Sequence, residues 1–302
     1  MSNAPAITPA THIPQQKTKM MQIRKSMRQY PLVYIGAAIV IIVTALALFA
    51  PWISPHDPTK VFTDGLTKDG IPVGPSAKFP LGTDGNGRDV LSRVLWGGRV
   101  SLLIGFLSMA INLFVGIVMG LIAGAFSGWV DALVMRVTDI ILAFPFLLFA
   151  LALVAILGPN LWNILFAIGI LGWGVMARVV RGQVLQVREL EYVQAERALG
   201  ASQWRIMFKV ILPNVFGPVI VLSTLNVGMN ILAAAGLSFL GLGIQPPTPD
   251  WGGMIQMGLQ TYTYAPYELY GSGIALVITV VGFNLLGDGL RDILDPHSAT
   301  RK

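Results

Sequence analysis

The segment from Glu189 to Pro213 reads ELEYVQAERALGASQWRIMFKVILP, and it is a polar interruption between long apolar stretches. Strong helix formers from Tyr192 to Leu199 predict one helix. Gly200 is placed to end this helix, because glycine readily adopts the left-handed conformation of a helix stop. Ser202 can cap a second helix, which we expect Pro213 to end or kink. The segment therefore predicts two helices around a glycine turn, pressed against a membrane.

The second of these helices carries an apolar stripe beside a basic side. The apolar residues at positions i, i+3, i+4 and i+7 are Trp204, Met207, Phe208 and Ile211, while Arg205 and Lys209 lie four apart on a more polar side. Basic amphipathic helices beside a membrane most often lie in the lipid interface. Periodicity alone therefore favours a lipid-bound helix.

The composition is that of a membrane protein. Of the 302 residues, 54% are hydrophobic and only 12% are charged, whereas soluble domains average about a quarter charged residues. Cysteine is absent, which excludes disulfides, thiolate metal sites and a cysteine nucleophile. The three histidines, His12, His56 and His297, lie outside the apolar stretches. This placement argues against a histidine proton relay inside the membrane.

Six apolar stretches predict an all-α, polytopic membrane protein with six transmembrane helices. They cover residues 32–53, 102–126, 140–157, 161–176, 215–240 and 271–290. Residues 1–31 are expected to form a cytoplasmic polar tail and a basic anchor segment. The basic stretch is also compatible with a cleaved signal peptide, but the long polar lead and the long apolar core argue against cleavage.

Two long segments between the spans are expected to be loops. Residues 54–101 are rich in Pro, Gly and Asp, and residues 241–270 carry four tyrosines that suit a membrane interface. In the first loop Asp84, Asn86 and Asp89 raise the possibility of calcium binding. An EF-hand loop needs Glu at its twelfth position, however, and Leu95 stands there. We therefore expect a folded connector.

The second span contains a glycine at every fourth position, namely Gly116, Gly120 and Gly124. These glycines lie on one helix face and allow close approach of a neighbouring helix. We expect them to serve packing rather than gating.

The distribution of positive charge predicts the orientation in the membrane. With both termini in the cytoplasm, 15 of the 21 Lys and Arg residues lie on the cytoplasmic side, and residues 241–270 have none. The other six lie in residues 54–101, where five Asp balance them. Because positive charge favours the cytoplasmic side, we expect residues 189–213 to face the cytoplasm and both long loops to face outside.

The sequence contains no recognisable catalytic constellation. No stretch matches G-x-x-x-x-G-K-[ST], whose backbone N–H groups would hold nucleotide phosphates, and no Gly is followed by Lys. We therefore expect no catalytic residue, no cofactor and no metal site on this chain. If the protein uses ATP, another chain must hydrolyse it.

A polar stripe runs along the fifth span. Ser223, Asn226 and Asn230 lie at positions i, i+3 and i+7. Polar groups inside a membrane cost free energy unless they face protein or water. The stripe is therefore a candidate lining of a translocation pathway, although hydrogen bonds between helices would also explain it.

The residue order in the segment quoted first resembles the signature loop of ATP-binding-cassette (ABC) importer permeases. The family pattern is Glu-Ala-Ala, three residues, Gly, nine residues, Ile, one residue, Leu-Pro, and this chain departs from it at Gln194, Glu196 and Val210. In the family, this loop forms coupling helices that dock into a groove on a separate ATPase subunit. The resemblance implies that role for Tyr192, Gln194, Ala195, Glu196, Ala198, Gly200, Ala201, Trp204, Arg205, Leu212 and Pro213.

Three further stretches narrow the resemblance. PLGTDGNGRD at 80–89, LSFLGLG at 237–243 with PPTPDWG at 246–252, and FNLLGDGLRD at 283–292 resemble the C-type permease of dipeptide, oligopeptide and nickel importers. The resemblance implies a type I importer permease with its core in residues 102–302, in a bacterial inner membrane. It also implies a B-type permease, two ATPase subunits that hold ATP and Mg, and an external solute-binding protein as partners, with no nucleic acid.

Short peptides are the expected solute, since nickel would favour the His and Cys ligands that the spans lack. The alternatives are a permease of the same type for nickel, glutathione or another small solute, and a stand-alone ion-driven carrier.

Overall fold

The computed structural model describes residues 31–126 and 128–294, whose regular elements are helices. Five helices are long and apolar enough to cross a membrane, and a sixth crossing results if one sharply bent pair counts as a single span. The expected all-α membrane fold is confirmed. Of the polar tail and anchor segment expected at residues 1–31, residues 1–30 lie outside the described residues, as do residues 295–302.

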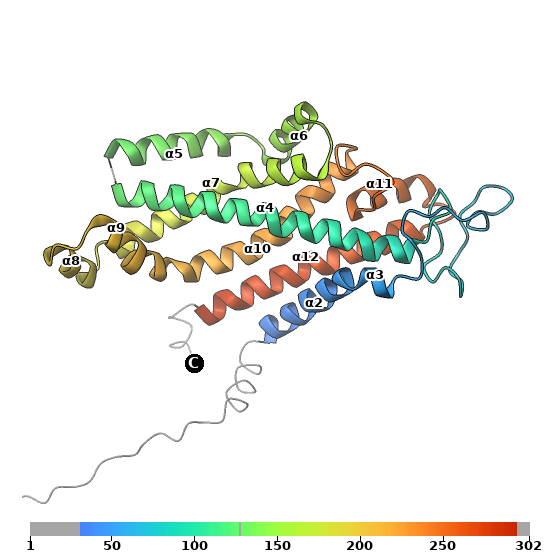
Figure 1. The fold of residues 1–302 in the computed structure, drawn as a ribbon, viewed down its shortest axis with the longest axis horizontal. Helices are drawn as coiled ribbons and strands as arrows, with labels where there is room; N and C mark the ends of the chain where they lie inside the picture. The colour runs from blue at the N-terminus through green and yellow to red at the C-terminus, as the bar shows by residue number, and fades with distance from the viewer. Residues whose placement is uncertain (1–30, 127, 295–302) are drawn as a thin grey trace, which may run out of the picture.

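The long helices run back and forth between two ends of the molecule (Figure 1). In chain order they are α2 (Pro31–Leu48), followed by the short α3 (Ala50–Ile53), then α4 (Val90–Phe126), α7 (Leu161–Val187), α10 (Leu212–Phe239) and α12 (Tyr267–Leu294). The start of α2, the end of α12 and the segment between α7 and α10 lie at one end. Residues 54–89 and α11 (Trp251–Thr261) lie at the other end.

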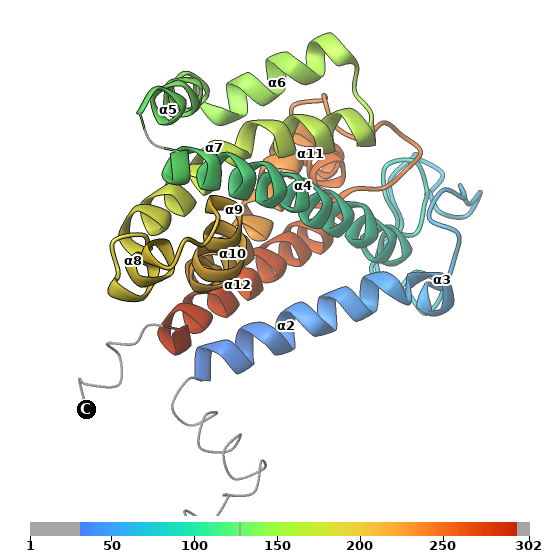
Figure 2. The same ribbon diagram turned by 60° about the vertical axis from the view of Figure 1, so that its left-hand side comes forward.

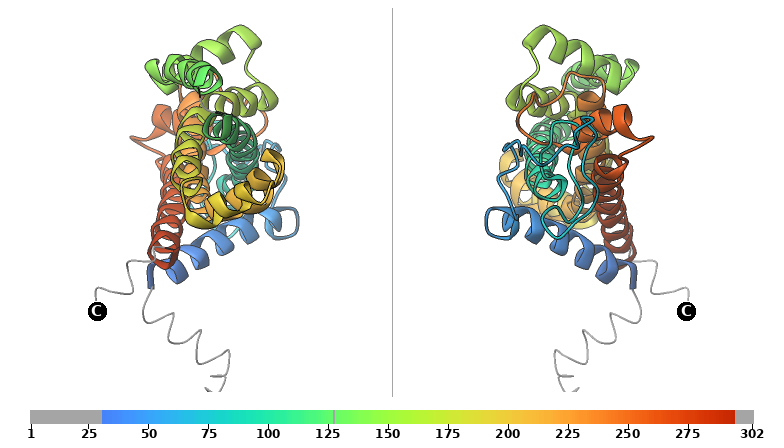
Figure 3. Two further views of the ribbon diagram at one scale, coloured as in Figure 1. Left: turned by 90° about the vertical axis from the view of Figure 1, so that its left-hand side faces the viewer. Right: turned by 90° about the vertical axis from the view of Figure 1, so that its right-hand side faces the viewer.

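Two smaller helices, α5 (Gly128–Ala143) and α6 (Phe146–Leu157), lie on the side of the bundle opposite α2 (Figure 2). Views along the bundle show α8 (Glu191–Ala198) in front of one end and the chain between α3 and α4 in front of the other (Figure 3). We call residues 54–89 together with residues 240–266 the cap.

The glycines of α4 form its contact with α7. A Cβ added at Gly116, Gly120 or Gly124 would lie 2.5–2.6 Å from the nearest side-chain atom of Met176, Val180 or Val184, respectively. No side chain fits into such a space, so the two backbones approach closely, as small residues at every fourth position allow. The predicted packing role of these glycines is confirmed.

The third expected span, 140–157, is not one straight helix. It contains the end of α5 and all of α6, which meet at an angle of 88°. Pro145 stands directly before α6. Proline lacks the N–H that a continuing helix needs, and it disfavours helical backbone at the preceding residue. Residues 128–139, which lie between two of the expected spans, belong to α5, and Asp131 pairs there with Arg181 of α7.

Two helices start inside segments that the sequence assigns to loops. α4 begins at Val90 rather than near residue 102, and α11 lies within residues 241–270. At the start of each of these two helices, an aspartate in the N-cap position accepts a free backbone N–H. The N–H of Ser92 donates to Asp89 at 2.9 Å, and the N–H of Gly253 donates to Asp250 at 3.1 Å. Apolar runs mark the part of a helix inside lipid, whereas the helix itself extends further.

Candidate functional site

The segment assigned to coupling forms a tight bend between α8 and α9 (Gln203–Arg205). Gly200 has φ +81°. The N–H of Ala201 donates to the carbonyl of Glu196 at 3.1 Å, and the N–H of Gly200 donates to the carbonyl of Arg197 at 3.0 Å, which together form a Schellman stop. Ser202 then caps α9 by accepting a backbone N–H at 3.3 Å. The expected helix, glycine turn and capped helix are confirmed, and we call residues 191–211 the α8 bend.

Most residues assigned to coupling lie on the surface of this region. Tyr192, Gln194, Ala195, Ala198, Gly200, Trp204, Arg205 and Pro213 are exposed, whereas Glu196, Ala201 and Leu212 are half-buried. Leu199 is 85% exposed and Trp204 is 60% exposed. Large exposed apolar side chains commonly mark an interaction site where they form a patch. The α8 bend therefore presents large apolar side chains that stay mostly exposed among the described residues.

The expected single apolar stripe of the second helix divides into two faces. Met207 and Ile211 are buried, whereas Trp204 and Phe208 are exposed and stack with ring centroids 5.7 Å apart. The reason is η1 (Ile206–Ile211), a π-helical turn, which holds more residues per turn than an α-helix. The prediction of one stripe was wrong, because it assumed α-helical spacing. Two aromatic rings are left on the outer face.

Pro213 does not end the second helix. Helical backbone continues from Gln203 to Phe239 through α9, η1 and α10. Pro213 lies in the first turn of α10, where proline is tolerated, and the hydrogen-bonding pattern changes from π to α at that point. The α8 bend is thus directly continuous with a membrane-crossing helix.

Three contacts join the α8 bend and the preceding end of α7 to the last turn of α4. Gln203 Nε2 donates to the carbonyl of Ala125 at 3.0 Å. The guanidinium of Arg188 donates to the carbonyl of Gly124 at 3.1 Å. The ring of Trp204 lies edge-on to Phe126, with centroids 6.4 Å apart. The last carbonyls of a helix have no partner within it. These side chains supply such partners and connect the bend to α4.

A cavity of about 620 Å³ lies between α4, α7 and α10, a size typical of small-molecule sites. Leu142 and Phe146, on either side of the break between α5 and α6, form part of its wall. The wall is mostly apolar, and none of the residues that line it is charged. The cavity can therefore hold a small solute, but it offers that solute no charged partner.

Two of the three residues assigned to the pathway line this cavity. Asn226 and Asn230 do so together with Asn112 of α4. Asn112 Oδ1 and Asn230 Nδ2 are buried and have no hydrogen-bond partner among the described residues, which costs about 1–3 kcal/mol for each group. Ser223 is outside the lining, and its hydroxyl donates to the carbonyl of Val219 in its own helix at 2.7 Å.

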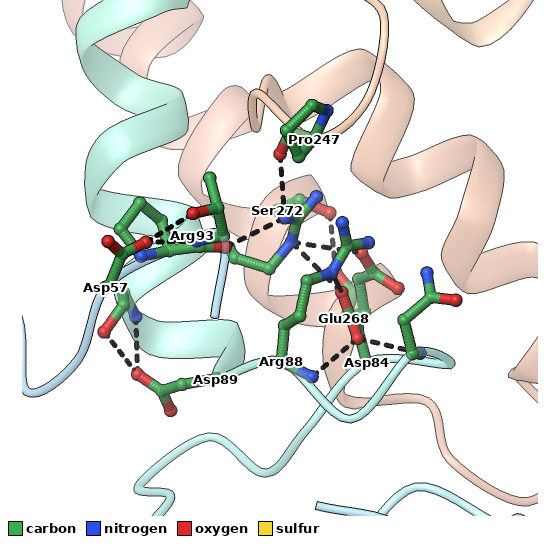
Figure 4. A network of polar contacts seen from close by, with 12 residues as sticks. Asp57, Asp84, Arg88, Asp89, Arg93, Pro247, Glu268 and Ser272 are labelled. Carbon is green, nitrogen blue, oxygen red and sulfur yellow. Dashed lines mark hydrogen bonds and ion pairs between the residues drawn. The ribbon is translucent and has the colours of Figure 1, made fainter. Parts of the chain in front are cut away.

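Four charged side chains are buried where the cap meets α4 and α12 (Figure 4). Asp84 accepts from Arg88 Nε at 2.6 Å and lies 3.2 Å from Arg93 Nε, while Arg93 reaches Glu268 at 4.0 Å. All four side chains are at most 6% exposed. Arg93 also donates to two proline carbonyls, one in each loop of the cap, at 3.1 and 3.3 Å. One guanidinium thereby connects both loops, α4 and α12.

Three further acidic side chains of the cap take part in local hydrogen bonds. Asp89 accepts the backbone N–H of Ser92 at the start of α4. A hydrogen bond from the Thr59 hydroxyl lowers the pKa of Asp57. Burial raises the pKa of Asp250, although the N–H of Gly253 partly offsets this effect. These carboxylates, like Asp84, are engaged by groups of this chain rather than gathered around a common point.

The bundle, its cavity and the exposed bend define a multi-pass membrane protein of the transport class. Residues 116–299 match the family described as binding-protein-dependent transport system inner membrane component, and the chain belongs to this family. Residues 19–69 match the N-terminal TM domain of oligopeptide transport permease C. The chain is a permease component of an ABC importer and resides in the inner membrane.

Characterised relatives cover nearly the whole chain. The di/tripeptide transport system permease protein of Pseudomonas aeruginosa is 43% identical over 98% of this chain and 97% of its own length. The dipeptide transport system permease protein of Alkalihalophilus pseudofirmus is 42% identical over 90% and 88%, respectively. The glutathione transport system permease protein of Pectobacterium atrosepticum is 40% identical over 90% and 89%.

Sequence reasoning did not single out Asn112, Gln203 or Arg188. Asn112 is an amide within an apolar span, and this alone is a signal that could have identified it, as it identified Asn226 and Asn230. Gln203 and Arg188 gave no comparable signal, because their partners are backbone carbonyls at the end of a helix far away in the chain.

Proposed function

We propose that this chain is one of two different permease subunits of an ATP-driven importer of short peptides. A B-type permease forms the other half of the pathway, two ATPase subunits bind ATP and Mg²⁺, and an external binding protein delivers the solute. This chain itself carries no catalytic site and no cofactor. The α8 bend faces the cytoplasm and receives the ATPases, and the cap faces the binding protein.

The observation that carries this proposal is the α8 bend. Leu199, Trp204 and Phe208 are large, apolar and exposed on a bend that is fixed by a Schellman stop and tied to α4. Aromatic side chains on a rigid support are typical anchors of protein interfaces. The excess of positive charge in this part of the chain supports its placement in the cytoplasm.

The contacts of the bend suggest how ATP drives transport. ATP binding closes the two ATPases and moves the α8 bend, which continues into α10 and is hydrogen-bonded to the end of α4. Both helices line the cavity, so their movement opens it alternately toward the two sides of the membrane. The partner's nucleotide thus biases a two-state element of this chain.

Peptides are the proposed solute for two reasons. Relatives at 42–43% identity are named for dipeptide or di/tripeptide transport. The cavity offers amides and apolar side chains but none of the imidazole or thiolate ligands that nickel favours. Glutathione is the alternative, since a relative at 40% identity is named for it.

The test is Gly200→Val in the complete transporter, reconstituted in liposomes with its ATPases and binding protein. A Cβ at this position meets no atom within 4 Å, so the effect comes from the backbone. Valine at φ +81° costs about 1–2 kcal/mol and should distort the stop of α8. We expect unchanged ATP binding by the isolated ATPases but a loss of peptide uptake per ATP hydrolysed.

Gly200→Asn is the matched control, because asparagine tolerates the left-handed region, and it should retain most of the coupling. Wild-type coupling in Gly200→Val would contradict the proposal. Gradient-driven uptake by the purified chain alone in liposomes would contradict it as well.

A further inference from the structure

We propose that Asn112 and Asn230 bind a peptide bond of the solute inside the cavity, so that this site recognises the peptide backbone and not the side chains. Asn226, on the same wall as Asn230, offers a further amide to the solute. The inference rests on the proposed function, because it places the cavity on the path of the solute.

The two side chains present complementary unpaired groups. Asn112 is 2% exposed and Asn230 is 6% exposed. Asn112 Oδ1 and Asn230 Nδ2 are buried without a partner among the described residues, one an acceptor and the other a donor. A side-chain amide offers both a donor and an acceptor whichever way it is turned. A peptide bond has one N–H and one C=O, the two groups that pair with such an acceptor and such a donor. Both atoms are closed off in this structure, so the solute reaches them when the helices around the cavity move apart.

The position of Asn112 depends on a glycine in the neighbouring helix. A Cβ added at Gly172 of α7 would lie 2.7 Å from Asn112 Oδ1 and 2.8 Å from its Cγ. The amide therefore occupies the space that a side chain at this position would fill. Asn112 and Asn230 come from different helices, α4 and α10, that are built into the bundle. Groups held on packed helices are positioned precisely before a ligand arrives.

The remainder of the wall argues against other ligands. The lining contains no charged side chain, so a metal ion finds no partner of opposite charge. Leu147, Leu171 and Met229 provide apolar surface that accepts varied side chains. A lipid acyl chain would fit this surface but would leave both amides unpaired. A peptide backbone matches both parts of the wall.

The experiment compares uptake of trialanine with uptake of its ester analogue, in which an oxygen replaces one peptide N–H. The complete transporter is reconstituted in liposomes, and the ratio of the two ATP-driven uptake rates is measured for the wild type and for Asn112→Leu. Any preference of the binding protein is the same in both and cancels when the ratios are compared. We expect Asn112→Leu to lower the amide-to-ester ratio about fivefold to tenfold, as for the loss of one hydrogen bond.

Further variants make the result independent of any one substitution. Gly172→Ala, which displaces the Asn112 amide without changing either asparagine, should lower the ratio in the same way. Asn230→Leu removes the donor to the solute C=O, which the ester retains, so it should lower the uptake of both analogues and change their ratio little. Thr224→Val is the control, because the Thr224 hydroxyl donates to the carbonyl of Ile220 in its own helix and lies outside the cavity. Its ratio should equal that of the wild type.

The inference is wrong if Asn112→Leu and Gly172→Ala take up peptide with the wild-type ratio, or if Asn230→Leu lowers the uptake of neither analogue, as expected for a cavity filled by lipid or by the partner permease. It is also wrong if the wild type does not distinguish amide from ester beyond the preference of its binding protein. Absence of ATP-driven peptide uptake by the wild-type complex would instead contradict the proposed function.

Discussion

At the cap, Asp84, Arg93 and Glu268 are buried to 2% exposure or less, and each lies within 4.0 Å of an opposite charge of the same chain. At the α8 bend, Arg205 and Glu196 are 61% and 36% exposed, and their charged groups are 3.9 Å apart. The cap also buries Trp251, whereas the bend exposes Trp204. The two ends of one bundle thus differ in where their polar and apolar groups are placed.

This difference shows which end of the bundle finds partners for its buried charges within this chain. Buried ions need their partners in place, because an uncompensated buried charge is costly. The cap finds these partners among its own loops, α4 and α12, and it therefore has a defined structure without another subunit. The α8 bend leaves its aromatic side chains uncovered, as expected for a surface that another chain completes.

Arg93→Met should have the largest effect on stability. It removes the cation between Asp84 and Glu268. Asp84 keeps Arg88, but the buried Glu268 loses the arginine that lies 4.0 Å away, and breaking a buried ion pair costs about 3–5 kcal/mol. We expect a much lower unfolding temperature of the purified complex in detergent, measured by thermal unfolding. Arg99→Met, an exposed arginine of the same helix, is the control and should change this temperature little.

Trp204→Ala should have the next largest effect, on binding rather than on stability. A central aromatic anchor contributes about 2 kcal/mol or more to an interface, so the permease complex should bind its ATPases about 30-fold more weakly. The measurement is the dissociation constant for the ATPases in detergent. Trp52→Ala, at the opposite end and 78% exposed, is the matched control. Equal ATPase affinities of the two variants would show that the α8 bend is not the docking surface for the ATPases.

Gln203→Leu should have the smallest of the three effects. It removes the hydrogen bond to the carbonyl of Ala125, which contributes about 1 kcal/mol, but leaves the exposed aromatic rings in place. We expect normal ATPase binding and a reduced number of peptides taken up per ATP hydrolysed. The exposed Gln186 of α7 provides the control variant, Gln186→Leu. Unchanged stoichiometry in Gln203→Leu would show that this contact does not transmit movement to α4.

Features that depend on local pattern could be predicted from the sequence. The apolar runs predicted an all-α membrane protein, because a bilayer requires long apolar helices. The glycines of α4 predicted close packing, and Gly200 predicted the end of α8. For the candidate site, the residue order predicted which segment forms an exposed bend, and two of the three polar residues of α10 line the cavity.

Features that depend on tertiary packing could not be predicted in this way. The break before Pro145 was not predicted, and the 88° angle between α5 and α6 depends on what they pack against. The π-helical turn at Ile206–Ile211 moved Trp204 and Phe208 away from Met207 and Ile211, and no residue type signals such a turn. Asn112 of α4 lines the same cavity as Asn226 and Asn230 of α10. Predicting this from the sequence would require knowing which helices are neighbours.

The length of α4 has a consequence for how this chain can change during evolution. Its 37 residues extend about 55 Å at about 1.5 Å per residue, far beyond a hydrocarbon core of about 30 Å. One inserted residue between Arg93 and Gly116 would rotate one part of the helix by about 100° relative to the other. Either the arginine would leave its carboxylates or the glycines would leave α7. An insertion of a whole helical turn would restore the faces but would still separate the two parts by about 5 Å along the axis. Natural length variation should therefore occur in the loops and not in this helix.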